Sequence, residues 1–382
     1  MILSKKSQAK VPIVYYHSIG PVNFAWKKSF LTLDPNIFEE QLIWLKERYT
    51  FIFLRELWQA QHGAIRPFRD AIILTFDDGY LDNWIWAFPL LKKHGVKATI
   101  FVSPQFVDQE TEYRPNHDDY RKGNATLEEI TKWGFLSWTE MRIMENSGLI
   151  DIQSHTMTHT KYFVSDEIIG FHHPDSDSLH YITNIFPEKK PYYITDKSFD
   201  DLVPYGYPVF NSQPSIIARK VEINQRFVDS CIISLEGYDF HNYIFSKALG
   251  IIQPLYEEYR EGRQLITSYE SQHDYLERIK YEIVMSKKII EEKLNKTVEF
   301  LCWPFGENTI AAHEIALEAG YLMTTRGKFK GFAKNDLTRI PERIGINLSS
   351  SFHKFKTLAK LKALGGDFPY SSLLNVARFR EV

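Results

Sequence analysis

The sequence predicts an α/β fold built on parallel strands, as either an open sheet or a barrel. Apolar segments rich in strand-forming residues alternate with segments of helical period over most of the chain. This alternation is typical of parallel strands joined by crossover helices. Polar residues suited to catalysis follow several of these strands, at the ends where α/β proteins gather their functional groups. The 382 residues suffice for a barrel with an insertion or for two domains.

The first half of the chain supplies most of the predicted strands. The first strand is expected within VPIVYYHSIG, with His17 at its end, and Asp34 followed by Pro35 predicts the start of a helix. Ser137 is the expected N-cap of a later helix, because Glu140 stands three residues beyond it. The expected strands are 11–16, 50–54, 70–76, 97–104 and 149–155, and the expected helices are one that begins at Pro35 and those at 55–63, 83–95 and 136–148.

The alternation breaks at about residue 163 and resumes at about residue 271. The segment 163–270 is rich in Pro, Tyr, Asp and His, so we expect an insertion with structure of its own. After it come an amphipathic helix with Leu276, Ile279, Ile283, Ile289, Ile290 and Leu294 on one face, a strand in VEFLCWPFGENT, a helix at 310–320 and a late strand in LTRIPERIGINLS. The predicted units are 11–162 and 271–350 as two parts of one barrel, 163–270 as an insertion or cap subdomain, and 351–382 as a C-terminal extension.

Composition narrows the class of protein. The net charge of −2 gives no basis for a nucleic-acid partner, and two distant cysteines, Cys231 and Cys302, exclude a disulfide framework. No segment has the length and apolarity of a membrane span, and the N-terminus lacks the apolar core of a signal peptide. Taken at face value the chain is expected in the cytoplasm, although a protein trimmed of its signal peptide would look the same.

Four side chains suit a divalent metal site that activates water. Asp77 and Asp78 follow an apolar strand, and neighbouring residues on an extended backbone point in different directions, so one can bind a metal while the other faces the water beside it. His155 and His159 stand four residues apart in SHTMTH, a spacing that can turn both imidazoles toward one ion. Two histidines and one carboxylate leave coordination positions open for catalysis.

ILTFDDGY and SHTMTH resemble the first two motifs of the polysaccharide deacetylases, the NodB-homology or carbohydrate esterase family 4 enzymes. The resemblance covers roughly 11–160 and 274–347 and implies a distorted (β/α) barrel that removes N-acetyl groups from an amino sugar. It also implies Asp77 as general base and Asp78, His155 and His159 as ligands of one divalent ion, with Zn²⁺ first and Co²⁺, Ni²⁺ or Mn²⁺ as alternatives. WPFG resembles the third motif, which makes the backbone N–H of Phe305 the candidate oxyanion donor.

The sequence departs from the common family pattern at two places. RIGINLSSS lacks the acid histidine that most members have after the last strand, whereas the YH of the first strand resembles the permuted poly-N-acetylglucosamine deacetylases. His17 is therefore the expected general acid, with His353 as the fallback. Cys302 stands where many members have an arginine that steadies the catalytic aspartate. Arg339 or Arg343 is expected to supply that charge, and Arg339 is taken as the candidate.

The predicted substrate is an N-acetylated saccharide in a polysaccharide or glycoconjugate. A small nucleotide- or lipid-linked sugar is the alternative within the same chemistry, and a catalytically inactive glycan-binding protein is the alternative outside it. The insertion is expected to cap the mouth of the barrel, where its aromatic residues would shape a glycan cleft or an oligomer interface. The insertion also contains His172, His173, His180 and His241, and FHHPDSD, which includes the first two, is the alternative site for a second metal.

Overall fold

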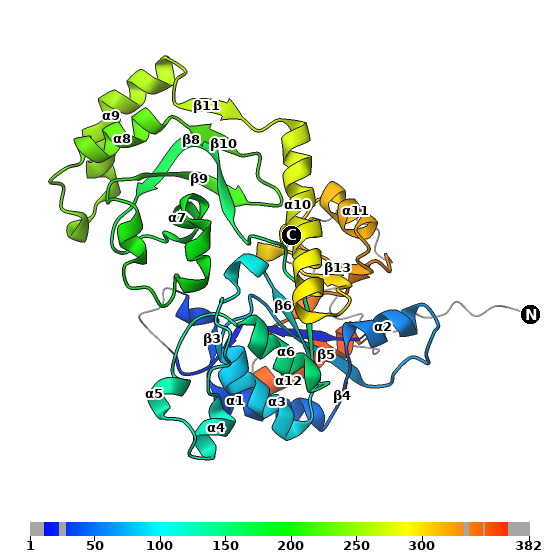
Figure 1. Ribbon diagram of the computed structural model, residues 1–382. Helices are drawn as coiled ribbons and strands as arrows, with labels where there is room; N and C mark the ends of the chain where they lie inside the picture. Colours follow the sequence, from blue (N-terminus) through cyan, green and yellow to red (C-terminus); the bar gives the residue numbers. More distant parts are fainter. Residues whose placement is uncertain (1–10, 23–27, 330, 332–335, 347, 366–382) are drawn as a thin grey trace, which may run out of the picture.

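A single mostly parallel sheet organises the molecule (Figure 1). The computed structural model describes residues 11–22, 28–329, 331, 336–346 and 348–365. Its strands follow the order β14-β13-β12-β7-β6-β5-β1-β15, every neighbouring pair is parallel, and β4 adds to β5. These strands are β1 (Ile13–Tyr16), β4 (Thr50–Phe51), β5 (Ala71–Phe76), β6 (Ala98–Val102), β7 (Ile150–Ser154), β12 (Phe300–Leu301), β13 (Met323–Thr325), β14 (Arg339–Ile340) and β15 (Arg343–Ile344).

The sheet curls into an incomplete barrel. Its two edge strands, β14 and β15, are separated in the chain by Pro341 and Glu342 alone, so the edges must lie close together. β14 pairs with β13 and β15 pairs with β1, and the chain itself rather than a ladder of hydrogen bonds joins the two edges. The predicted α/β fold, a distorted barrel, is confirmed in this form.

Helices cover the outside of the sheet. Asp34 accepts hydrogen bonds from the N–H groups of Asn36 and Ile37 at the start of α1, and Ser137 and Glu140 form the predicted capping box of α6. Gly95 ends α3 with a φ of 63°, a left-handed conformation that glycine adopts without strain. The helices of this layer are α1 (Pro35–Lys46), α2 (Leu54–Gln61), α3 (Phe88–His94), α6 (Trp138–Asn146), α10 (Gln272–Leu294), α11 (Ile310–Glu318) and α12 (Ser351–Leu364), with short helices α4 (His117–Arg121) and α5 (Leu127–Ile130) in the loop before α6.

The segment between β7 and α10 has sheets and a core of its own. β8 (Lys161–Phe171) pairs antiparallel with β9 (Pro208–Pro214), and β10 (Val221–Ile223) pairs antiparallel with β11 (Ile266–Tyr269). α8 (Gln225–Ser234) and α9 (Phe245–Glu261) pack on this layer, away from the parallel sheet, while α7 (Leu179–Ile185) lies nearer to it (Figure 1). A separate hydrophobic cluster holds the outer part together, formed by Ile168, Phe171, Phe210, Phe227, Cys231, Leu235, Phe240, Ala248, Ile252, Tyr256 and Leu265.

Several elements differ in extent from the prediction. The strand expected at 50–54 ends at Phe51, because α2 begins at Leu54, and the helix expected from Asn83 begins with a π-helical turn, η2 (Asn83–Ala87). On α10 the buried face includes Glu282 and Ser286, whereas the predicted Leu276 and Ile289 are only half-buried. Among the helices that the structure describes, none combines the length and apolarity needed to cross a membrane. Residues 366–382 of the predicted C-terminal extension lie outside the described residues.

Candidate metal centre and active site

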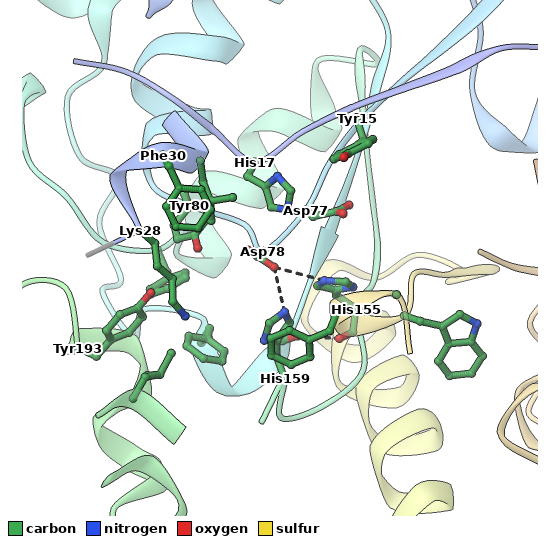
Figure 2. Close-up of a pocket in the computed structure, with 18 of the residues that line it drawn as sticks. Tyr15, His17, Lys28, Phe30, Asp77, Asp78, Tyr80, His155, His159 and Tyr193 are labelled. Carbon is green, nitrogen blue, oxygen red and sulfur yellow. Dashed lines mark hydrogen bonds and ion pairs between the residues drawn. The ribbon is translucent and has the colours of Figure 1, made fainter. Parts of the chain in front are cut away.

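The predicted site residues gather at one end of the parallel sheet. His17 follows β1, Asp77 and Asp78 follow β5, His155 follows β7, and Cys302 follows β12. The carboxyl ends of parallel strands meet at the same end of a barrel, which explains why these separate segments converge. Except for Cys302, which lies just behind Asp77, these residues line a cavity of about 430 Å³, shown in Figure 2.

Asp78, His155 and His159 form a set of possible metal ligands. The Oδ1 atom of Asp78 lies 3.3 Å from Nε2 of His155 and 3.2 Å from Nε2 of His159, and the three ligand atoms lie within 4.8 Å of one another. The Nδ1 atom of His155 is 2.8 Å from the carbonyl oxygen of Cys302. That hydrogen bond places the proton on Nδ1 and leaves Nε2 free to ligate, an arrangement typical of metal-binding histidines.

The backbone around these ligands is held in an uncommon conformation. Asp78 has a φ of 74°, His159 a φ of 44° and Phe305 a φ of 58°, in the left-handed region that residues other than glycine seldom adopt. Gly79, next to Asp78, has a φ of 69°, and a Cβ atom there would lie 2.8 Å from Cγ1 of Val102. Such conformations concentrate at functional sites, where the surrounding structure must hold them in place.

Asp77 points to a different partner from Asp78. Its two carboxylate oxygens accept hydrogen bonds of 2.6 Å and 2.8 Å from the guanidinium of Arg343, which approaches from β15. Burial alone would raise the pKa of Asp77, but the Arg343 charge outweighs it and holds the pKa below its usual value. Asp77 is therefore ionised, and it lies beside the possible metal site without belonging to the Asp78 set.

The structure places the two candidate arginines differently. Arg339, taken as the candidate from the sequence, lies on β14 and donates hydrogen bonds to the carbonyl oxygens of Thr325 and Arg326. Arg343, the alternative, is the arginine that contacts Asp77. β15 pairs with β1, next to the strand that carries Asp77, whereas β14 pairs with β13, so the two arginines have different neighbours.

Cys302 lies behind Asp77 rather than in the cavity. It is fully buried, its Sγ atom is 3.8 Å from Oδ1 of Asp77, and Arg343 donates a 3.0 Å hydrogen bond to that sulfur. The small side chain at this position thus leaves room for the guanidinium of a different strand.

Two further predicted residues line the same cavity. His17 lies above Asp77 and Asp78 in Figure 2, and Asn83 fixes the end of β1 by donating a 2.8 Å hydrogen bond to the His17 carbonyl. In the turn after β12, the N–H of Phe305 has no acceptor among the residues that the structure describes. His353, the fallback acid, lies in the first turn of α12, where its N–H donates to the hydroxyl of the N-cap Ser350, and it does not line the cavity.

A buried network that the sequence analysis missed supports the loop between the two histidines. The carboxylate of Glu282, on α10, accepts hydrogen bonds from the N–H groups of Met157 and Thr158 at 3.1 Å and 2.9 Å, and from the hydroxyls of Thr158 and Ser215. Lys190 donates to the Thr158 carbonyl at 2.7 Å, and burial lowers its pKa to about 8. The sequence contained one indication of this network: Glu282 is a carboxylate on the apolar face of an amphipathic helix, where a charged residue is rare unless it is paired.

The predicted insertion contributes walls to the cavity. Leu179 and Tyr193 from this segment line it, beside barrel aromatics such as Tyr80, Phe106 and Phe135. Its histidines form no metal cluster among the described residues: the ring of His172 bonds to Tyr181, Ser176 and the Asp200 carbonyl, the ring of His173 stacks on Tyr243, His180 is buried near Phe305, and His241 is exposed.

Comparisons with known proteins find similarity to polysaccharide deacetylases. Residues 66–193 match the polysaccharide deacetylase family model. The chain is 36% identical over 101 residues to "Putative polysaccharide deacetylase YxkH" of Bacillus subtilis, a match that covers 26% of this chain and 34% of that protein. It is 26% identical over 128 residues to the poly-beta-1,6-N-acetyl-D-glucosamine N-deacetylase of Escherichia coli, covering 33% of this chain and 18% of the other. The matches thus span about a third or less of each relative.

The fold has a counterpart among solved structures. A de-N-acetylase from Aggregatibacter actinomycetemcomitans superimposes with a TM-score of 0.54 at 18% identity, over 91% of this chain and 98% of that one. At this identity the likeness concerns the fold. The family match and the sequence relatives confirm the resemblance to the polysaccharide deacetylases, and the structural neighbour confirms the fold.

Proposed function

We propose that the protein is a metal-dependent hydrolase that removes N-acetyl groups from an amino sugar of a polysaccharide or glycoconjugate. The observation that carries the proposal is that two adjacent carboxylates have different partners. Asp78 faces two histidines. Asp77 faces the same cavity, and the charge of Arg343 keeps its carboxylate ionised. The relatives named as deacetylases support this reading of the site.

The residues present fit a divalent metal ion. Asp78, His155 and His159 offer one oxygen and two nitrogen atoms close enough to share one ion, a donor set that suits Zn²⁺ and leaves positions open. When bound, such an ion supplies Lewis-acid polarisation of the amide carbonyl and lowers the pKa of water. Zn²⁺ is our first proposal, and Co²⁺, Ni²⁺ and Mn²⁺ would accept the same donors.

The remaining residues supply proton transfer and charge stabilisation. Asp77, kept ionised by Arg343, is the proposed base that takes the proton of the attacking water. His17, across the cavity, is the proposed acid that protonates the departing amine as the C–N bond breaks. The backbone N–H of Phe305 is the proposed donor to the oxyanion.

Two other functions were left open by the sequence. Deacylation of a small nucleotide- or lipid-linked sugar would use the same residues, because a cavity of about 430 Å³ accommodates a small ligand as well as the end of a glycan. A binding protein without catalysis would need neither an ionised base nor an acid beside the metal ligands. The presence of Asp77 and His17 in one cavity therefore favours an enzyme.

The metal content of protein purified without chelator tests the site first. We expect about one divalent ion per chain, lost in His155→Ala and His159→Ala and retained in Asp77→Asn and in the exposed control His241→Ala. Acetate release from N-acetylated chito-oligosaccharides should then be abolished in Asp77→Asn, although metal is retained. Wild-type protein that stays empty after metal addition, or an Asp77→Asn variant that remains active, would refute the mechanism.

A further inference from the structure

One wall of the cavity carries positive charge that forms no ion pair with an acidic side chain of the described residues. Both carboxylates in the lining are already engaged, Asp77 with Arg343 and Asp78 with the two histidines. Lys28 also lines the cavity, and Figure 2 shows its side chain extending into it on the side of Tyr193 and His159. Within the described residues, no carboxylate forms an ion pair with the Lys28 ammonium.

A second lysine borders the same wall. Lys161, the first residue of β8, follows His159 by two positions, and its Nζ lies 4.9 Å from the ring centre of Phe305. That ring is in turn 4.6 Å from the ring of His159. Lys161 also forms no ion pair with a described carboxylate. Two ammonium groups on one wall repel each other, because they carry the same charge.

His180 lies beside the same Phe305 ring. Its side chain is 9% exposed, its ring lies 5.7 Å from that of Phe305, and its Nδ1 atom has no hydrogen-bond partner in the described part of the chain. Burial and then Lys28 hold the pKa of His180 well below its usual value, so it remains neutral. A buried donor or acceptor without a partner costs stability unless a ligand or water satisfies it.

A neutral N-acetylated sugar would form no ion pair with the lysines of this wall. Its acetamido carbonyl belongs at the metal ligands, and its hydroxyls carry no charge to offset two ammonium groups in a partly closed cavity. A carboxylate or phosphate would relieve the mutual repulsion of the lysines and form charge-assisted hydrogen bonds with them. Lysine suits either anion because its ammonium acts as a compact point charge.

We propose that the saccharide bound in this cavity carries an anionic group, a carboxylate or a phosphate, held by Lys28 and Lys161 over the ring of Phe305. This inference rests on the proposed function, because it names a property of the substrate of the same site. It assigns to Lys28 and Lys161 a role in substrate selection and none in the chemical step.

Binding and turnover together test the inference. Calorimetry would compare the metal-loaded protein with N-acetylglucosamine, N-acetylglucosamine 6-phosphate and N-acetylmuramic acid, in wild type and in Lys28→Met and Lys161→Met. The control is Lys247→Met, at an exposed position of α9 remote from the cavity lining. We expect an anionic sugar to bind about tenfold more tightly than the neutral one, and each cavity variant to lose most of this preference while the control retains it. The phosphate and carboxylate sugars show which anion is preferred.

The outcomes separate this inference from the proposed function. Equal affinity for neutral and anionic sugars would overturn the inference, and acetate release from neutral sugars would still support the deacetylase. A preference for anions that persists in both lysine variants would also overturn it, because the anion would then be held by the metal or by Arg343. Retained lysine-dependent binding with no acetate released from any sugar would refute the proposed function instead.

Discussion

Replacing Glu282 by alanine should loosen the loop that carries two of the three proposed metal ligands. The Glu282 carboxylate holds the N–H groups of Met157 and Thr158, which lie between His155 and His159. It also accepts from the hydroxyls of Thr158 and Ser215. The substitution removes all of these acceptors at once from a site that is 1% exposed.

The expected loss of stability follows from the buried polar groups that Glu282→Ala leaves without a partner. Two buried N–H groups lose their acceptor, and the buried Lys190 ammonium loses the nearby negative charge that favours it. Removing one member of a buried charged network costs about 3–5 kcal/mol of unfolding free energy. Because the His159 backbone has a positive φ that only its surroundings maintain, metal affinity should also fall, by about 10- to 100-fold.

Urea unfolding and competition with a chromophoric chelator would measure the two effects separately. Glu270→Ala is the matched control, because the Glu270 carboxylate is also buried and pairs with Arg278 at 2.7 Å, but its contacts do not include the metal loop. Both variants should lose stability, and only Glu282→Ala should lose metal affinity. Equal metal affinities in the two variants would show that Glu282 stabilises the fold without positioning the ligands.

Three other substitutions have defined consequences. Arg343→Lys replaces a two-pronged contact with Asp77 by a single one, so kcat for acetate release should fall about tenfold or more. Gly79→Ala combines a φ of 69° with a clash against Val102, and urea unfolding should show a loss of about 2–4 kcal/mol. Burial raises the pKa of Asp82 to about 6, so the stability contributed by its neutral form is present at low pH and lost as the pH rises through 6. Asp82→Asn should therefore gain up to about 3 kcal/mol relative to wild type between about pH 4 and about pH 7.

Each of these predictions has a control or a contradicting result. Arg339→Lys should leave kcat within about twofold, because Arg339 bonds to backbone carbonyls away from Asp77. Gly95→Ala, with a φ of 63° and nothing within 4 Å of the new Cβ, should cost only about 1 kcal/mol. An Asp82→Asn variant whose stability runs parallel to that of wild type across the pH range would show that Asp82 does not titrate near pH 6 in the folded protein.

The strand ends could be predicted from the sequence because the determining signals are local. Apolar strands such as Ala71–Phe76 are followed directly by their polar residues, and parallel strands place those residues at one end of the sheet. Asp77, Asp78, His155 and His159 were thus expected to meet before any tertiary contact was known. The helix caps at Asp34 and Ser137 were equally local, and both formed as predicted.

Residues that act across the chain could not be predicted in this way. Glu282 meets Thr158 at a separation of 124 residues, after an insertion whose path no local pattern describes. Lys28 reaches the cavity from a loop with no predicted element, and Lys161 was hidden in the transition to the insertion. Nothing in their neighbouring residues distinguishes these lysines from ordinary solvent-exposed ones, which is the more common environment for lysine.

The sequence could not show which of Arg339 and Arg343 contacts Asp77. Both lie in the short segment TRIPER. Strands of two residues are too short for the pattern of apolar and polar residues to predict which strands they pair with. The pairing decides: Arg343 stands opposite Ile13 of β1, and β1 lies beside β5, whose end carries Asp77. The guanidinium then passes the Cys302 sulfur at 3.0 Å. A cysteine at this position is therefore compatible with an ionised base, because the charge that it cannot supply comes from β15 through the space that a larger residue would fill.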